Sequence, residues 1–348
     1  MEKNIVICCD GTRNKPSLHN TNVVKLFSLV EKETNQIVYY DPGVGSLSQG
    51  FLQAYQGATG LGLSENIKEA YVFLMNNYKV GDKVFLFGFS RGAYTVRCLA
   101  GVLYRIGLLQ KGSYNLIDYA ILQYFDRENP EVTPEFKKSF SRKCEVHFVG
   151  VWDTVGAFIP YPPSHKFHNN YLNPNIPFGY QALAIDEKRK DFKPEIWDIH
   201  PESVLQDDGL TQTIEQVWFA GVHSDVGGSN PSEGLSDISL NWMIMKAKAQ
   251  GLITCPKPEL DKEINENIED KIYESRTGIW KLRPEFRRKI KENSLIHHTV
   301  LDRIMGKVDG YSPKNLPQNP NEILSKYRIV DKLGEIEETS PSDVMSFG

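Results

Sequence analysis

The chain has 348 residues, a formal net charge of −4, 24% charged and 40% hydrophobic residues, values that are typical of a folded globular protein and exclude a mainly disordered chain. The mildly acidic balance offers no basic surface, so we expect no nucleic-acid partner. The longest apolar runs, such as 84–89, have the length of a strand and fall far short of the ~20 residues that a membrane-spanning helix needs.

The N-terminal segment and the cysteines bear on the compartment. The chain reaches Asp10 after one short apolar run and lacks the apolar region and cleavage site of a secretory signal. Its five cysteines contain no CxxC pair and are too few for a disulfide framework. We therefore predict a cytoplasmic protein without a structural zinc site.

Apolar runs that end at turn residues alternate with helical patterns through the first 250 residues. The runs predict strands over 5–9, 37–40, 83–87, 145–152 and 216–222. The helical patterns predict helices over 22–30, 64–78, 92–106, 114–125 and 235–249, with a short charged helix over 182–190. This alternation is typical of the α/β class, with a mostly parallel, doubly wound sheet that is covered on both faces.

Two regions depart from the alternation. Residues 157–215 begin with many Pro, Asn, Tyr and His residues, so we expect an insertion that, with the glycine-rich loop 51–63, lines a lid. Its aromatic residues fit ordinary loop packing equally well; they are Phe158, Tyr161, Phe167, Tyr171 and Phe178. Residues 251–348 form a charged, helical extension, with helices expected over 262–275 and 283–292, that packs on the domain formed by 1–250.

The sharpest motif is Gly88-Phe89-Ser90-Arg91-Gly92, which fits the G-x-S-x-G nucleophile elbow. It follows a run of strand formers and leads into a helical pattern, which is the context that the elbow requires. Ser90 must occupy a tight, strained turn to present its hydroxyl, and small residues at 88 and 92 let the strand and helix close on each other. A plain turn serine is the less favoured alternative.

A serine hydroxyl needs a base to accept its proton and an acid to orient that base. Asp153 follows the strand expected at 145–152, and His223 follows the one at 216–222. The carboxyl ends of parallel strands meet at one edge of a sheet, where α/β proteins place their sites. The sequence therefore predicts a triad of Ser90, Asp153 and His223.

The oxyanion hole needs backbone N–H donors. One is expected from Arg91, which follows the serine, and a second from the loop after the first strand, with Gly11 and Thr12 as candidates. An equal alternative is that Asp10 only braces this loop through its own hydrogen bonds.

Three alternatives remain open. Asp225 is a second candidate acid, with His298 or its neighbour His297 as the base. A metal-assisted hydrolase would use Asp10, Asp153, His223 and Asp225 as ligands for Mn or Mg. The third alternative is a binding module, without catalysis, on a hydrolase scaffold.

The sequence resembles the catalytic domain of the type VI secretion phospholipase effectors, as a stand-alone member, over residues 3–250. The resemblance is carried by segments 9–12, 21–23, 40–45, 81–82, 87–94, 151–155, 186–187 and 218–228. It implies an α/β-hydrolase fold, the triad Ser90, Asp153 and His223, no metal or other cofactor, and hydrolysis of lipid or other small carboxylic esters. Further hypotheses are peripheral contact with a membrane, delivery by a secretion machine, and an inhibitory or regulatory protein partner.

Overall fold

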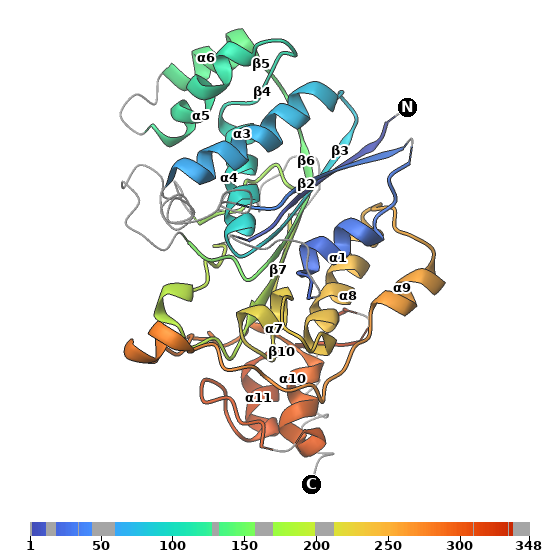
Figure 1. Cartoon of the computed structure of the whole chain (residues 1–348), viewed down its shortest axis with the longest axis vertical. Helices are drawn as coiled ribbons and strands as arrows, with labels where there is room; N and C mark the ends of the chain where they lie inside the picture. The colour runs from blue at the N-terminus through green and yellow to red at the C-terminus, as the bar shows by residue number, and fades with distance from the viewer. Residues whose placement is uncertain are drawn as a thin grey trace.

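The computed structural model describes residues 2–11, 19–33, 35–43, 60–126, 132–156, 170–198, 212–308, 310–332 and 334–336. Within these ranges an eight-stranded sheet runs through the molecule in the order β10-β9-β8-β7-β6-β3-β1-β2, with helices on both faces (Figure 1). Its pairings are all parallel. The strands are β1 (Asn4–Cys9), β2 (Gln36–Asp41), β3 (Lys83–Phe89), β6 (Val146–Trp152), β7 (Phe178–Ala184), β8 (Thr213–Phe219), β9 (Leu295–His297) and β10 (Arg328–Val330).

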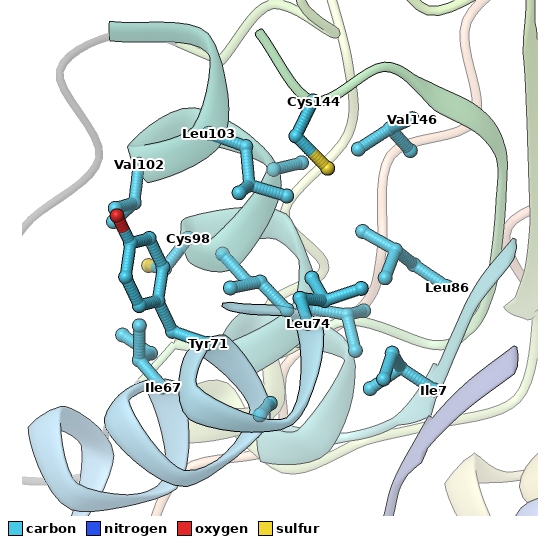
Figure 2. Packing of buried hydrophobic residues seen from close by; sticks show 14 of the residues in the cluster. Ile7, Ile67, Tyr71, Leu74, Leu86, Cys98, Val102, Leu103, Cys144 and Val146 are labelled. Carbon is cyan, nitrogen blue, oxygen red and sulfur yellow. The ribbon is translucent and has the colours of Figure 1, made fainter. Parts of the chain in front are cut away.

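Alternate residues of the buried strands face the two helical layers. Ile7 and Leu86 pack against the helices of one face, which are α3 (Gly60–Asn77), α4 (Arg91–Arg105) and α5 (Ile117–Phe125) (Figure 2). Val6 and Phe87 pack in a second cluster with α1 (Asn22–Leu29) and α8 (Gly234–Ala249). Strands buried on both faces read as continuous apolar runs, and this is why the sequence predicted most of them. The α/β class and the doubly wound parallel sheet are confirmed.

Smaller elements complete the fold. A short antiparallel pair, β4 (Leu108–Leu109) and β5 (Ser141–Arg142), lies beside α6 (Val132–Phe140). α7 (His223–Gly227) precedes α8, and the C-terminal part contributes α9 (Lys257–Glu263), α10 (His298–Asp302) and α11 (Pro320–Lys326). None of the helices in the described ranges has the length and apolarity to cross a bilayer.

The helix expected over 182–190 is wrong, because 178–184 is the central strand β7. The expected insertion 157–215 therefore includes part of the sheet. Gln181 interrupts the apolar run, but its amide accepts a 2.5 Å hydrogen bond from Thr154 and donates at 3.0 Å to Gln216, so the buried polar group is satisfied. The candidate lid residues at 51–59 and 157–169, with Phe158, Tyr161 and Phe167, lie outside the described residues.

The C-terminal extension is less helical than expected, since the helices over 262–275 and 283–292 are not formed. The isoleucines spaced by four at 264, 268 and 272 pack against the core in an irregular segment. Backbone N–H groups find partners elsewhere: Tyr273 donates to Asp225 at 3.2 Å, and Phe286 donates to the carbonyl oxygen of Lys188 at 2.9 Å. These contacts replace helical hydrogen bonds, while β9 and β10 extend the sheet.

The turn between β3 and α4 packs tightly against the end of β1. A Cβ added to Gly88 would lie 2.6 Å from the backbone nitrogen of Ala93, and one added to Gly92 would lie 2.5 Å from the carbonyl oxygen of Asp10. Both distances are shorter than real Cβ contacts, and the atoms met belong to the backbone, which cannot move aside easily. Glycine at both positions is thus a packing requirement of this fold.

We predict that Gly92→Ala lowers the stability of the protein by about 1–3 kcal/mol or more, because overpacking forces the backbone of β1 away from α4. The urea midpoint of unfolding measures the effect. Gly278→Ala is the control: its Cβ would meet no atom within 4 Å, so only its φ of +54° opposes the change. Equal midpoints for Gly92→Ala and the wild type would contradict the contact.

Candidate active site

The predicted nucleophile Ser90 stands between β3 and α4. Its φ of 57° and ψ of −121° lie in a backbone region that residues other than glycine rarely adopt. Ser90 makes no side-chain capping hydrogen bond to α4, and its backbone N–H donates to the carbonyl oxygen of Trp152 at 3.0 Å. Strained backbone of this kind is characteristic of functional turns.

Asp153 and His223 come from neighbouring parts of the same sheet edge. Phe89 of β3 pairs with Trp152 of β6, so Ser90 and Asp153 leave adjacent strands at the same level. His223 begins α7 after β8, and its Nδ1 lies 2.6 Å from Oδ2 of Asp153. Asp153 also has a positive φ, 41°, which turns the chain sharply where β6 ends.

Aromatic rings enclose the imidazole. The ring of Phe89, which precedes Ser90, lies 4.6 Å from the His223 ring between centroids, and the ring of Phe192 lies edge-on at 5.0 Å. His223 is 4% exposed and Ser90 is 8% exposed. The described contacts thus bring the predicted acid and base together, beside the strand end that carries the serine.

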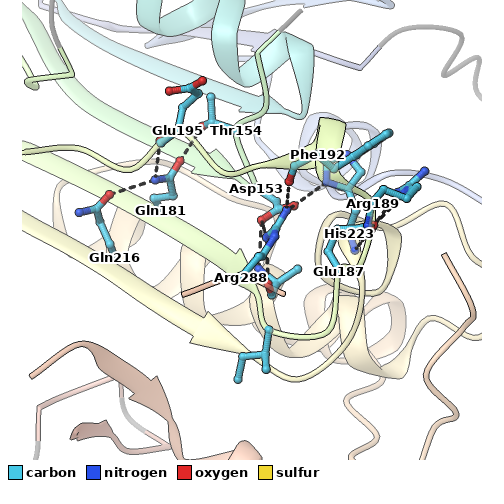
Figure 3. A network of polar contacts seen from close by, with 12 residues as sticks. Asp153, Thr154, Gln181, Glu187, Arg189, Phe192, Glu195, Gln216, His223 and Arg288 are labelled. Carbon is cyan, nitrogen blue, oxygen red and sulfur yellow. Dashed lines mark hydrogen bonds and ion pairs between the residues drawn. The ribbon is translucent and has the colours of Figure 1, made fainter. Parts of the chain in front are cut away.

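The carboxylate of Asp153 has a further partner that the sequence did not indicate. Arg288 places Nη1 at 2.5 Å from Oδ1 and Nη2 at 2.9 Å from Oδ2, while the backbone N–H of Ala184 donates to Oδ1 at 3.0 Å (Figure 3). Arg288 stands in the run Arg-Pro-Glu-Phe-Arg-Arg-Lys over 283–289, where nothing distinguishes it from its charged neighbours.

Burial and charge act in opposite directions on Asp153 and His223. Burial disfavours the ionised form of Asp153, but the charge of Arg288 and hydrogen bonds from His223 and Arg288 outweigh it and hold the pKa of Asp153 far below its usual range. Burial lowers the pKa of His223 below its ordinary value, and the hydrogen bond to Asp153 opposes this only in part. At neutral pH Asp153 is therefore ionised and His223 is neutral.

The alternative acid, Asp225, has a structural position. Its Oδ2 accepts the backbone N–H groups of Val222 at 2.9 Å and Tyr273 at 3.2 Å, and its Oδ1 accepts a hydrogen bond from Asn230 at 2.6 Å. These contacts hold the start of α7 and tie the C-terminal segment to it. No contact of Asp225 with an imidazole ring is found among the described residues.

The alternative bases lie one strand further along the sheet. His297 stacks on Phe219 with a 4.7 Å centroid separation, and its Nδ1 lies 2.9 Å from the hydroxyl of Thr299. Nδ1 of His298 lies 3.1 Å from Oδ2 of Asp302. The described contacts therefore pair neither histidine with Asp153 or Asp225.

The expected oxyanion donors lie at the start of α4 and in the loop after β1. Arg91 is the first residue of α4, so its backbone N–H lies at the N-terminal end of the helix, where the helix dipole favours negative charge. The N–H of Gly11 donates to Oδ1 of Asp10 at 2.7 Å, while Oδ2 of Asp10 accepts from Thr21 at 2.6 Å. Asp10 thus braces its loop and engages the Gly11 donor; Thr12 lies outside the described residues.

The proposed metal ligands do not fit a cation well. Among the residues that the structure describes, no group of three or more His, Cys, Asp or Glu side chains is arranged to hold a metal ion. Both oxygens of Asp153 accept hydrogen bonds from a guanidinium, whose positive charge would repel a second cation. Asp10 and Asp225 are hydrogen-bonded to their own loops.

Comparisons with known proteins identify relatives. The sequence matches the family described as "T6SS, Phospholipase effector Tle1-like, catalytic domain" over residues 3–246. It is 35% identical over 219 residues to the uncharacterized protein YEL023C of Saccharomyces cerevisiae, which corresponds to 55% of this chain and 32% of that protein. The chain thus spans about a third of the length of this curated relative.

Two solved structures are more distant. A Pseudomonas aeruginosa protein matches with a TM-score of 0.46 and 16% identity, over 77% of this chain and 49% of the other. The Tle1 effector bound to the VgrG spike of a type 6 secretion system matches with a TM-score of 0.47 and 15% identity, over 77% of each chain. On the family match, which covers most of its length, the chain belongs to the Tle1-like catalytic-domain family of phospholipase effectors.

Proposed function

We propose that this chain is a serine hydrolase that cleaves carboxylic esters of lipids, with Ser90 as nucleophile, His223 as general base and Asp153 as the orienting acid. Family membership supports hydrolysis of lipids. The single observation that carries the finer proposal is the 2.6 Å contact of His223 with Asp153 at the sheet edge where the strained turn carries Ser90. Acyl transfer by a serine requires a nucleophile, a base that accepts its proton and a group that orients the base.

The proposed reaction has two stages. The hydroxyl oxygen of Ser90 attacks the ester carbonyl carbon while the ring nitrogen of His223 that faces away from Asp153 accepts the hydroxyl proton. The backbone N–H groups at the start of α4, Arg91 first, stabilise the developing oxyanion. His223 then donates the proton to the departing alcohol, which leaves the acyl group bonded to Ser90. A water molecule that gives its proton to His223 attacks this acyl group, and His223 returns the proton to the Ser90 oxygen as the carboxylic acid departs.

We predict that Ser90→Ala lowers kcat by a factor on the order of 10⁶, because Ser90 is the nucleophile of the proposed mechanism. Hydrolysis of p-nitrophenyl esters of several chain lengths and labelling with a fluorophosphonate probe are the two measurements. Ser139→Ala, at an exposed position of α6, is the control and should retain both. Wild-type turnover by Ser90→Ala would show that the nucleophile lies elsewhere.

The two candidate acids are separated by their asparagine variants. Asp153→Asn should lower kcat by about 10⁴, because the amide donates a hydrogen bond where His223 needs an acceptor. Asp225→Asn should act mainly on stability, because Asp225 accepts backbone N–H groups around α7. Turnover and thermal midpoints of both variants decide the assignment, and a large loss of turnover at Asp225 alone would reverse it.

The lowered pKa of His223 predicts the pH profile. Protonated His223 cannot accept the serine proton, so kcat/KM should fall as the pH drops and should level off above the pKa. The midpoint should lie below the ordinary histidine value of ~6.5 and should persist in EDTA. His297→Ala and His298→Ala should keep this profile. A midpoint above pH ~7 would contradict a base whose burial dominates its titration.

A further inference from the structure

Arg288 lies outside the residues that match the family, 3–246, yet it is among the most buried side chains of the protein, with 1% exposure. Its two terminal nitrogens donate to both oxygens of Asp153 and also to two backbone carbonyls, those of Ala184 at 2.8 Å and Phe192 at 2.6 Å. A planar guanidinium in this two-point contact fixes the plane of the carboxylate as well as its distance.

This contact acts on the ionisation of Asp153. The carboxyl group is fully buried, and burial alone would favour its neutral form. A protonated Asp153 would be a poorer acceptor for the Nδ1–H of His223, so the imidazole would lose the partner that sets its tautomer. A positive charge 2.5 Å from Oδ1 keeps the acceptor ionised without solvent.

The same guanidinium also holds the residue that covers the base. The carbonyl of Phe192 accepts from Arg288, and the Phe192 ring packs edge-on against the imidazole of His223 (Figure 3). Arg189 lies 3.4 Å from the centre of the Phe192 ring and pairs with Glu187, whose carboxylate accepts the backbone N–H of His223 at 3.3 Å. Arg288 thus contacts both the acid and the group that encloses the base.

We propose that Arg288 is a positioning residue of this site: it keeps Asp153 ionised and oriented toward His223. A residue beyond the matched catalytic domain thereby holds the acid of the triad in place. This proposal rests on the proposed serine mechanism. It assigns the C-terminal part of the chain a role in catalysis as well as in packing.

A positioning role has an electrostatic consequence that a packing role lacks. The charge of Arg288 offsets that of Asp153 and so weakens the stabilisation of a protonated His223. Removing this charge lets the Asp153–His223 pair take up a proton more readily, whichever of the two groups carries it, so the pKa of this uptake should rise. The acid limb of kcat/KM should then move upward by about one unit of pH.

The test compares three variants of the full chain. Arg288→Met removes the charge and keeps much of the side-chain volume, while Arg288→Lys keeps the charge and loses the two-point contact. Arg287→Met is the matched control, because the neighbouring Arg287 side chain is 54% exposed and lies 3.5 Å from Glu285. For each variant kcat, KM, the pH profile on a short p-nitrophenyl ester and the thermal midpoint are measured.

We expect Arg288→Met to lose about 10²-fold in kcat, with KM nearly unchanged, and to show the raised acid limb. Arg288→Lys should lose kcat to a smaller extent and keep the wild-type limb, and Arg287→Met should resemble the wild type. If Arg288→Met folds and its kcat/KM falls at the same acidic pH as that of the wild type, the proposal is overturned and Arg288 is a structural residue. Should Arg288→Met fail to fold, Arg288→Lys decides: wild-type kcat overturns the proposal, and reduced kcat at the wild-type limb supports it.

Ser90→Ala separates this proposal from the proposed function. An inactive Ser90→Ala beside Arg288 variants with wild-type kinetics refutes the positioning role alone. An active Ser90→Ala refutes the serine mechanism, and the positioning role of Arg288 fails with it.

Discussion

The site depends on how one buried carboxylate, that of Asp153, is kept charged. A carboxylate removed from water is stable only when hydrogen bonds and opposite charge replace its hydration. Its partners come from distant parts of the chain: the backbone of Ala184 in β7, the ring of His223 in α7 and the guanidinium of Arg288. The central strands, the loop after β8 and the C-terminal segment must therefore converge on one point.

The parallel sheet makes that convergence geometrically simple. β3, β6, β7 and β8 are consecutive neighbours, so their carboxyl ends open on a common edge. Trp152 links two of these ends, because it pairs with Phe89 and its carbonyl accepts the N–H of Ser90. The next residue, Asp153, donates its own N–H to Ala182 at 2.8 Å. Backbone hydrogen bonds of the sheet thus position the turns that carry Ser90 and Asp153.

Local pattern was enough to predict part of this arrangement. The five-residue motif from Gly88 to Gly92 predicts the turn, and Asp153 and His223 each follow a run of strand formers. β7 was missed because Gln181 breaks its apolar run and is satisfied only by Thr154 and Gln216 in the folded chain. Arg288 could not be distinguished from its charged neighbours, since its burial depends on a carboxylate 135 positions away in the sequence.

The charges around His223 form two compact pairs, Asp153 with Arg288 and Glu187 with Arg189. In each pair the cation offsets part of the charge of its carboxylate, and burial is the largest influence on the pKa of His223, ahead of the hydrogen bond and charge of Asp153. In the proposed mechanism, charge separates only when the serine proton moves, giving an imidazolium and an oxyanion. The imidazolium then has the fixed Asp153 oxygen at Nδ1, and the oxyanion has the start of α4. Such a site would stabilise charge mainly in the transition state, which is where stabilisation accelerates a reaction.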